Sequence, residues 1–248
     1  MVVFKKDYDD AISLKVSLPA AEGPFKNKQI HLKEYTAWTR HNSYLADLLP
    51  ENSTENMLFL NEPVGLGAGV KGAEDAFLSR DLNDLPKRRR YYLPAFSMLD
   101  SETGAKIAAL NGSDNPLKFW EKNFLEPMAK GLAELRAKTG AEHTSPHSQN
   151  IMVELDENMK PTGKVVLRDL DFYLDESSFD RFNRVVKDKD GLIDRRLSDK
   201  IAKFQRHLFS LRNGLEHLPS WMSEKDYGDW VKTYFSVFGD RYSEVTGI

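Results

Sequence analysis

The segment from His143 to Asp171 constrains the fold of this 248-residue chain more than any other stretch. It contains a polar loop with two histidines, an apolar run, a polar turn, a second apolar run and an acidic end. The two apolar runs, Ile151–Leu155 and Lys164–Leu167, have the length and composition of β-strands, and the turn between them suits a hairpin. We therefore expect an antiparallel hairpin with polar, chemically reactive residues at its rims.

The geometry of this hairpin brings two candidate metal ligands together. In an antiparallel pair the start of one strand lies opposite the end of the other, so we expect Asn150 and Asp169 side by side. An amide oxygen and a carboxylate suit a magnesium ion that keeps several waters and bridges nucleotide phosphates. His147 and Gln149 precede the first strand, where they can contact a nucleotide or a reacting carboxyl group. The alternative is a surface hairpin in which Asp169 pairs with a neighbouring arginine, because short motifs also match by chance.

The same residues resemble the C-terminal half of the NRPS-independent siderophore synthetases of the aerobactin-synthetase type. The signature of that family is Glu-Ala-His-x-Gln-Asn, followed by an apolar strand, an Asp-rich turn and Val-Leu-Arg-Asp. The matching residues in this chain are His147, Gln149, Asn150, Arg168 and Asp169. Residues 90–99 are similar to a family segment that reads Leu-Pro-Ala-Ala-Leu.

The resemblance has departures that bear on activity. Lys15 lies in a segment similar to a lysine-containing strand of the family, but Ser145 replaces the signature glutamate. Asn61 stands where the family has an arginine before a Glu-Pro pair. Family members are more than twice as long, and their N-terminal half supplies side chains for ATP and substrate. A homo-oligomer or a partner chain would then have to supply that half, or the activity would be altered.

The resemblance implies an ATP-dependent ligase of siderophore biosynthesis and iron acquisition, which requires ATP and Mg²⁺. It would join a citrate-like polycarboxylate to an amine or an alcohol through an acyl adenylate. The residues implied are His147 for catalysis, Lys15, Gln149, Asn150, Arg168 and Asp169 for nucleotide binding, and Asn150 and Asp169 for the metal. A non-catalytic nucleotide- or ligand-binding module, or a partner subunit, is the first alternative.

A kinase-like phosphotransferase is the second alternative, because the spacing is also that of the aminoglycoside-phosphotransferase loop His-Gly-Asp-x-His-x-x-Asn. In phosphoryl transfer the Asp of this loop accepts the substrate proton, while the Asn and a later Asp hold magnesium. Ser145 occupies the position of the base here. Serine is a poor base, so ordinary kinase chemistry is disfavoured although the nucleotide and metal positions are retained.

Composition excludes several other classes of protein. The chain has no cysteine, which rules out disulfides, thiolate zinc sites, iron–sulfur clusters and a cysteine nucleophile. A formal net charge of -3 gives no electrostatic basis for binding nucleic acid. No apolar run approaches the roughly 20 residues of a membrane-spanning helix, and the first residues lack a signal-peptide pattern. We expect a cytoplasmic protein that binds neither nucleic acid nor a membrane.

The pattern along the chain predicts an α+β fold with a mixed, mainly antiparallel sheet in the first half and a helical second half. By resemblance this fold is similar to the palm region of the siderophore synthetases and distantly kinase-like. We expect a β-rich, nucleotide-side region at 1–100 and a hairpin-bearing helical region at 101–248, within one compact unit. The glycine-rich residues 65–72 predict a mobile loop near the substrate.

Helices are expected where apolar residues recur at intervals of three and four. One covers residues 32–49, and another runs from the Asn115-Pro116 cap to Gly140, with Pro127 expected to kink it or to split it in two. Three more are expected over residues 177–187, 194–217 and 223–238, with serine or aspartate caps.

Overall fold

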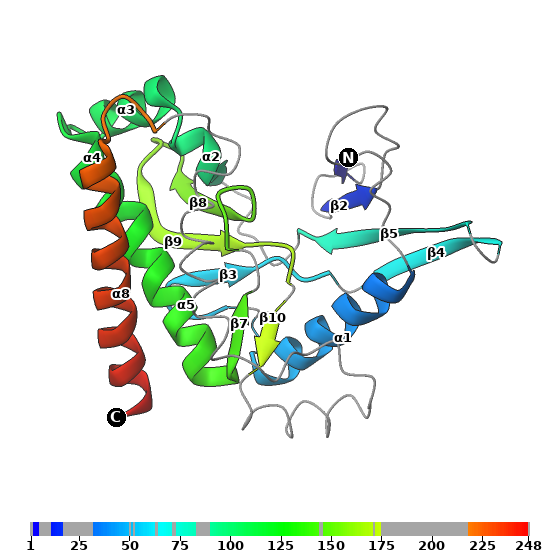
Figure 1. Ribbon diagram of the computed structural model, residues 1–248. Helices are drawn as coiled ribbons and strands as arrows, with labels where there is room; N and C mark the ends of the chain where they lie inside the picture. Colours follow the sequence, from blue (N-terminus) through cyan, green and yellow to red (C-terminus); the bar gives the residue numbers. More distant parts are fainter. Residues whose placement is uncertain are drawn as a thin grey trace.

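The computed structural model describes residues 2–4, 11–16, 32–49, 51, 53–62, 64–70, 73–82, 90–143, 146–170, 172–174 and 218–247. Within these residues the chain forms three β-sheets, and long helices cover one side of the central sheet (Figure 1). The predicted mixed α/β fold, with a mainly antiparallel four-stranded sheet and a helical C-terminus, is confirmed. No helix in the described ranges is long and apolar enough to cross a membrane.

The central sheet contains the predicted hairpin. In spatial order its strands are β3 (Met57–Phe59), β9 (Pro161–Leu167), β8 (Ile151–Asp156) and β6 (Arg90–Pro94). β3 runs parallel to β9, and the other neighbours are antiparallel. Strands β8 and β9 form the expected hairpin, with a tight turn between Asp156 and Lys160. Buried residues fill both faces of β8, because helices cover one face and a smaller apolar cluster lies on the other.

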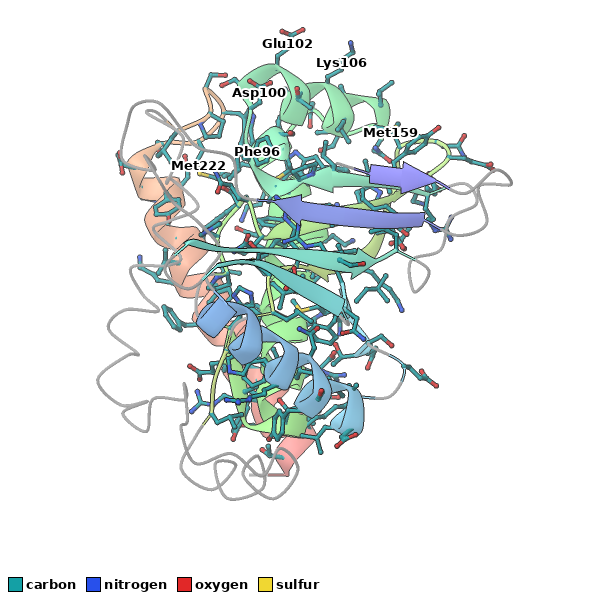
Figure 2. The ribbon with its side chains drawn as sticks, turned by 90° about the vertical axis from the view of Figure 1, so that its right-hand side faces the viewer. Phe96, Asp100, Glu102, Lys106, Met159 and Met222 are labelled. Atoms are coloured by element: carbon teal, nitrogen blue, oxygen red, sulfur yellow. The ribbon has the colours of Figure 1, made fainter. Side chains whose placement is uncertain are left out.

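A second sheet lies beside the central one and is antiparallel throughout. Its strands, in spatial order, are β1 (Val2–Phe4), β2 (Ala11–Val16), β5 (Ala73–Asp81) and β4 (Val64–Val70). In Figure 2 these strands face the viewer, in front of the helices that cover the central sheet. Helix α1 (Leu32–Leu48) packs against β4 and β5, close to its predicted bounds.

The expectation of a mobile loop at residues 65–72 was wrong. Residues 65–70 belong to β4, which pairs with β5 from Val64 opposite Ser79 to Val70 opposite Ala73. Glycine is unfavourable in strands, but here it alternates with apolar residues and its backbone groups are satisfied by the ladder. The pairing partner lies immediately beyond the glycines, so the segment becomes one arm of a hairpin.

The helices of the second half follow their local signals. The side chain of Asn115 caps α4 (Pro116–Trp120) by accepting from Lys118 N at 3.0 Å. A π-helical turn, η1 (Glu121–Leu125), separates α4 from α5 (Glu126–Thr139). Pro127 accounts for the π-helical turn, because it lacks an N–H and crowds the carbonyl four residues earlier. The predicted break in this helical segment is therefore confirmed. Gly140, at φ 71°, ends α5 in the left-handed conformation.

Three further helices complete the described structure. Helix α2 (Ala95–Met98) follows β6, and Asp100 caps α3 (Ser101–Leu110), from which Glu102 and Lys106 point away from the body (Figure 2). Helix α8 (Glu224–Thr246) begins with the predicted Ser223 cap, in a reciprocal capping box with Asp226, and extends beyond its expected end. The helices expected over 177–187 and 194–217 lie outside the described residues.

A close approach between α5 and β3 depends on a glycine. A Cβ atom at Gly131 would lie 2.6 Å from Cβ of Met57. We predict that Gly131→Ala lowers the free energy of unfolding by about 1–3 kcal/mol, because overpacking outweighs the gain in helix propensity. Urea unfolding measures this. Gly228→Ala in α8 is the control, since no atom lies within 4 Å of its Cβ, and it should be stabilising by about 0.5–1 kcal/mol. Equal effects of the two substitutions would contradict the packing argument.

Candidate functional site

The site lies where the β8–β9 hairpin meets the second sheet. The register pairs Ile151 with Leu167, and the backbone N–H of Arg168 donates to the carbonyl of Asn150 at 2.9 Å. Arg168, and not Asp169, is therefore opposite Asn150, which corrects the expected pairing by one residue. Asp169 therefore lies one residue beyond the Asn150–Arg168 contact.

Asp169 occupies an unusual backbone conformation beyond β9. Its φ of 57° is in the left-handed region, which aspartate tolerates better than most residues. Its carbonyl oxygen lies 2.7 Å from Nε2 of His143, a residue of the small antiparallel sheet formed by β7 (Ala141–His143) and β10 (Phe172–Leu174). A carbonyl oxygen only accepts hydrogen bonds, so Nε2 of His143 carries a proton. This contact holds the turn that presents the Asp169 side chain.

The Asp169 carboxylate forms an ion pair with Arg80 of β5. Nε of Arg80 also lies 2.7 Å from Oε1 of Glu62, which follows β3, and the side chain of Asn42 accepts from the Glu62 backbone N–H at 2.7 Å. Arg80 is 8% exposed and Glu62 1% exposed. A buried guanidinium thus joins two carboxylates that follow different strands, a geometry that the planar group of arginine favours.

Arg168 contributes a second guanidinium to the same site. Its Nε donates to the carbonyl of Gln149 at 2.6 Å, and no carboxylate of the described chain forms an ion pair with it. Burial lowers the pKa of the Arg168 guanidinium, the positive charge of Arg80 lowers it further, and the negative charge of Glu62 opposes both effects. A partly desolvated cation with a neutral backbone partner is poised to bind an anion.

His147 stands on the turn that leads into β8. The backbone N–H of Asn150 donates to the carbonyl of His147 at 2.8 Å, and the Asn150 side chain lies 3.4 Å from Nε2 of the ring. The backbone N–H of Gln149 lies 3.3 Å from Nδ1. The turn is also held to α2, since the N–H of Phe96 donates to the carbonyl of Ser148 at 3.2 Å. Histidine, amide and guanidinium groups therefore gather at the rim of one hairpin.

The structure brings together most of the residues singled out in the sequence. His147, Gln149, Asn150, Arg168 and Asp169 all lie at the hairpin rim. Lys15 lies in β2, where the register pairs it with Leu78, two residues before Arg80 on β5. Ser145 lies outside the described residues.

Sequence reasoning missed Arg80 and the role of Glu62, and it assigned no contact to His143. Glu62 had been noted only as part of a Glu-Pro pair, and Arg80 lies at the end of a segment to which no strand had been assigned. No periodicity in the sequence marks Arg80, and only the pairing of β5 with β2 reveals its position. Ser13 faces Arg80 in that pairing.

Asn150 and Asp169 could hold a magnesium ion only if phosphates supplied most of its ligands. Asp169 offers one carboxylate, whose other partner is Arg80, and Asn150 offers one amide oxygen. No group of three or more His, Asp or Glu side chains in the described ranges could hold a metal. Magnesium in nucleotide sites is commonly held by one or two protein ligands, phosphate oxygens and water. The residues present are therefore compatible with a metal that binds together with a nucleotide.

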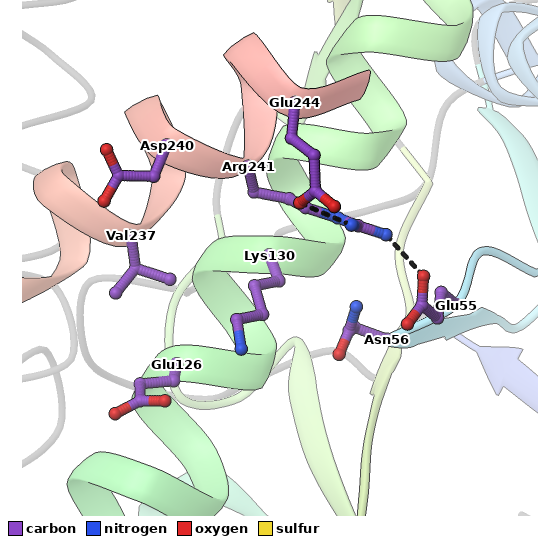
Figure 3. A pocket seen from close by; sticks show the side chains of 8 residues that line it. All are labelled: Glu55, Asn56, Glu126, Lys130, Val237, Asp240, Arg241 and Glu244. Atoms are coloured by element: carbon purple, nitrogen blue, oxygen red, sulfur yellow. Dashed lines mark hydrogen bonds and ion pairs between the residues drawn. The ribbon is translucent and has the colours of Figure 1, made fainter.

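A separate cavity of about 350 Å³ lies between α5, α8 and the residues that precede β3 (Figure 3). Arg241 of α8 crosses it and pairs with Glu134 at 2.8 Å, Glu244 at 2.7 Å and Glu55 at 2.5 Å. Glu134, 0% exposed, also accepts from the side chain of Asn56 at 2.6 Å. These contacts fasten α8 to α5 and to the approach to β3, so we assign the cavity to helix docking and not to the candidate site.

Two solved structures share this fold. The petrobactin biosynthesis protein AsbB from Bacillus anthracis aligns with a TM-score of 0.59 and 12% identity, over 98% of this chain and 46% of AsbB. The aerobactin synthetase IucC from a hypervirulent pathotype of Klebsiella pneumoniae aligns with a TM-score of 0.54 and 12% identity, over 99% of this chain and 48% of IucC. The chain shares its fold with about half of each of these two proteins. It spans less than half the length of either protein.

The likeness is one of fold and not of close sequence. No protein-family model matches the chain, and no curated protein matches it. The fold relation agrees with the resemblance seen in the hairpin motif, since the second of these proteins is an aerobactin synthetase.

His41 of α1 makes the region next to the site sensitive to acid. Burial lowers the pKa of its imidazole to about 4, the backbone of Leu170 opposes this shift, and electrostatic interactions with His143 and Arg40 add to it. The ring lies 4.2 Å from that of Phe172. Because the folded-state pKa is below the ordinary 6.5, the unfolded chain binds more protons between about pH 4 and pH 6.5.

We predict that His41 removes about 2 kcal/mol of stability as the pH falls from 7 to 5, because its neutral form must be protonated on unfolding. His41→Gln should flatten this part of the pH dependence, measured by urea unfolding at both values. His147→Gln, which leaves the buried histidine in place, should keep it. An unchanged pH dependence in the His41 variant would show that this imidazole titrates as it does in the unfolded chain.

Proposed function

We propose that the chain is an ATP-dependent ligase of the siderophore-synthetase type, which joins a carboxylate to an amine or an alcohol. The observation that carries the proposal is Arg168, a partly desolvated guanidinium without a carboxylate partner in the described chain, at the rim of the predicted nucleotide hairpin. The fold shared with a petrobactin biosynthesis protein and an aerobactin synthetase supports the same class of reaction. Citrate-like polycarboxylates are the proposed acids.

The proposed reaction has two steps. A carboxylate oxygen of the acid attacks the α-phosphate of ATP, the bond to the β-phosphate breaks, and an acyl adenylate and pyrophosphate form. The amine or hydroxyl then attacks the acyl carbon, AMP leaves and the nucleophile loses its proton. The barrier of the first step depends on donors that stabilise the negative charge developing on the phosphate. Magnesium supplies further charge neutralisation when it is bound.

The site residues take roles that follow from their positions. Arg168 and Lys15 would hold phosphate oxygens, and Gln149 would contact the nucleotide. His147, which lies next to Asn150 on the turn before β8, would donate a hydrogen bond to the phosphate in the transition state. Asn150 and Asp169 would hold the metal that accompanies the nucleotide. These roles match the positions implied by the family motif.

A second candidate is a module that binds a nucleotide or a siderophore-like ligand without turnover. The chain matches only 46% and 48% of the two similar structures, so more than half of each of those proteins has no counterpart in the matched region. A homo-oligomer or a partner chain would supply the remaining groups. Pyrophosphate release from ATP, on addition of citrate or another polycarboxylate, separates the ligase from the binding module. Thermal stabilisation by ATP and Mg²⁺ without pyrophosphate release would favour the module.

We predict that Arg168→Gln weakens ATP binding about tenfold or more, because it removes a charge-assisted hydrogen bond to phosphate. Isothermal titration calorimetry with a non-hydrolysable ATP analogue and Mg²⁺ gives the dissociation constant. Lys160→Gln is the matched control, since this exposed cation lies at the opposite end of the same hairpin and should leave the constant unchanged. Equal affinity of wild type and Arg168→Gln would remove Arg168 from the nucleotide site.

His147→Ala should reduce pyrophosphate release far more than it weakens ATP binding. An interaction made mainly in the transition state shows in turnover, and the loss of one such donor costs about 10²–10³-fold in kcat. The comparison requires single-turnover rates and the ATP dissociation constant of the same variant. Losses of similar size in both quantities would make His147 a binding residue only.

A further inference from the structure

The ion pair between Arg80 and Asp169 has a consequence for the order of ligand binding. Asp169 is the only carboxylate among the residues proposed as metal ligands, and its Oδ1 is occupied by a guanidinium. Arg80 is held in turn by Glu62, which is itself 1% exposed and anchored through Asn42. A metal ion approaching Asp169 therefore meets a fixed positive charge. The carboxylate cannot serve a divalent cation fully until that charge is drawn elsewhere.

We propose that Arg80 is a positioning residue that keeps Asp169 from binding a divalent cation until a polyphosphate enters the site. This inference rests on the proposed function and adds a residue that the motif does not contain. When phosphate oxygens arrive beside Arg168, they offer Arg80 a stronger anionic partner than one carboxylate. Arg80 then turns from Asp169 to phosphate, and Asp169 becomes available to the metal. Metal and nucleotide thus bind together.

Three features of the site support this assignment. Arg80 has two carboxylate partners, so it keeps Glu62 while it releases Asp169. The Asp169 side chain is 27% exposed, which leaves it accessible to a ligand, whereas that of Glu62 is 1% exposed. Arg168, which directly precedes Asp169, donates through Nε to the carbonyl of Gln149 at 2.6 Å, so a second guanidinium lies at the same hairpin rim. By reciprocity, a polyphosphate that raises metal affinity must have its own affinity raised by the metal.

The test measures metal binding directly, with Mn²⁺ detected by electron paramagnetic resonance. In the wild type, Mn²⁺ alone should bind weakly, and pyrophosphate should raise its affinity about tenfold or more. The variant Arg80→Gln/Glu62→Gln removes the guanidinium together with the buried carboxylate that would otherwise be left unpaired. It should bind Mn²⁺ alone about tenfold more tightly than the wild type, and pyrophosphate should enhance that binding less.

Three further variants make the result specific. Adding Asp169→Asn to the double variant should abolish the gain, because it removes the ligand that Arg80 had occupied. Arg90→Gln/Glu154→Gln removes a second arginine–carboxylate pair, with a distance of 3.6 Å, from the central sheet and should leave Mn²⁺ binding as in the wild type. Arg80→Lys, which keeps one positive charge without the planar guanidinium, should give a Mn²⁺ affinity between those of the wild type and the double variant. Near-ultraviolet circular dichroism establishes that each variant is folded.

The outcomes separate this inference from the proposed function. A folded double variant with the Mn²⁺ affinity of the wild type would overturn the role of Arg80, even if ATP binding and pyrophosphate release are normal. A gain that persists after Asp169→Asn would also overturn it, because the metal would then be bound elsewhere. A gain that depends on Asp169, in a protein that releases no pyrophosphate from ATP, would support Arg80 and count against the ligase. If the double variant does not fold, Arg80→Lys with unchanged Mn²⁺ affinity is the contradicting result.

Discussion

The buried guanidinium of Arg80 joins the two main sheets at the point where the candidate site is formed. It lies on β5, and its carboxylate partners follow β3 and β9 of the central sheet. Removal of one member of a buried ion pair leaves an uncompensated charge and typically costs about 3–5 kcal/mol. The position of Arg80 therefore fixes how closely the second sheet approaches the hairpin rim. The arrangement of Asp169, Arg168 and the His147 turn depends on that approach.

The elements that could be predicted from the sequence are those specified by neighbouring residues. Two apolar runs and a polar turn gave the β8–β9 hairpin, and Asn115-Pro116, Pro127 and Gly140 gave the start, the break and the end of the α4–α5 segment. Ser223 marked the start of α8. Caps, prolines and turn glycines act through backbone groups within one helical turn, so their effect does not depend on the rest of the fold. This is why such local signals were sufficient.

The parts that sequence reasoning missed depend on contacts between distant residues. Arg80 is 18 residues from Glu62 and 89 residues from Asp169, and no periodicity in the sequence connects them. The hairpin was correct, but its register at the rim differs from the expected one, because β8 and β9 stay paired up to the Asn150–Arg168 contact. A shift of one residue moves a side chain to the other face of a strand. The motif therefore identified residues that lie together at the hairpin rim, but not their mutual geometry.

The charges at the hairpin rim suggest why the motif contains an arginine directly before its aspartate. Asp169 by itself would attract a divalent cation, and Arg168 by itself would attract an anion. Together with Arg80 and Glu62 they form a site whose charges nearly balance when it is empty, which limits the cost of burying them. Under the proposed function, a nucleotide with its magnesium would bring negative charge and a cation together and satisfy both groups at once. The paired arginine and aspartate would then favour the metal–nucleotide complex over either component, and the left-handed conformation of Asp169 forms the turn that follows β9.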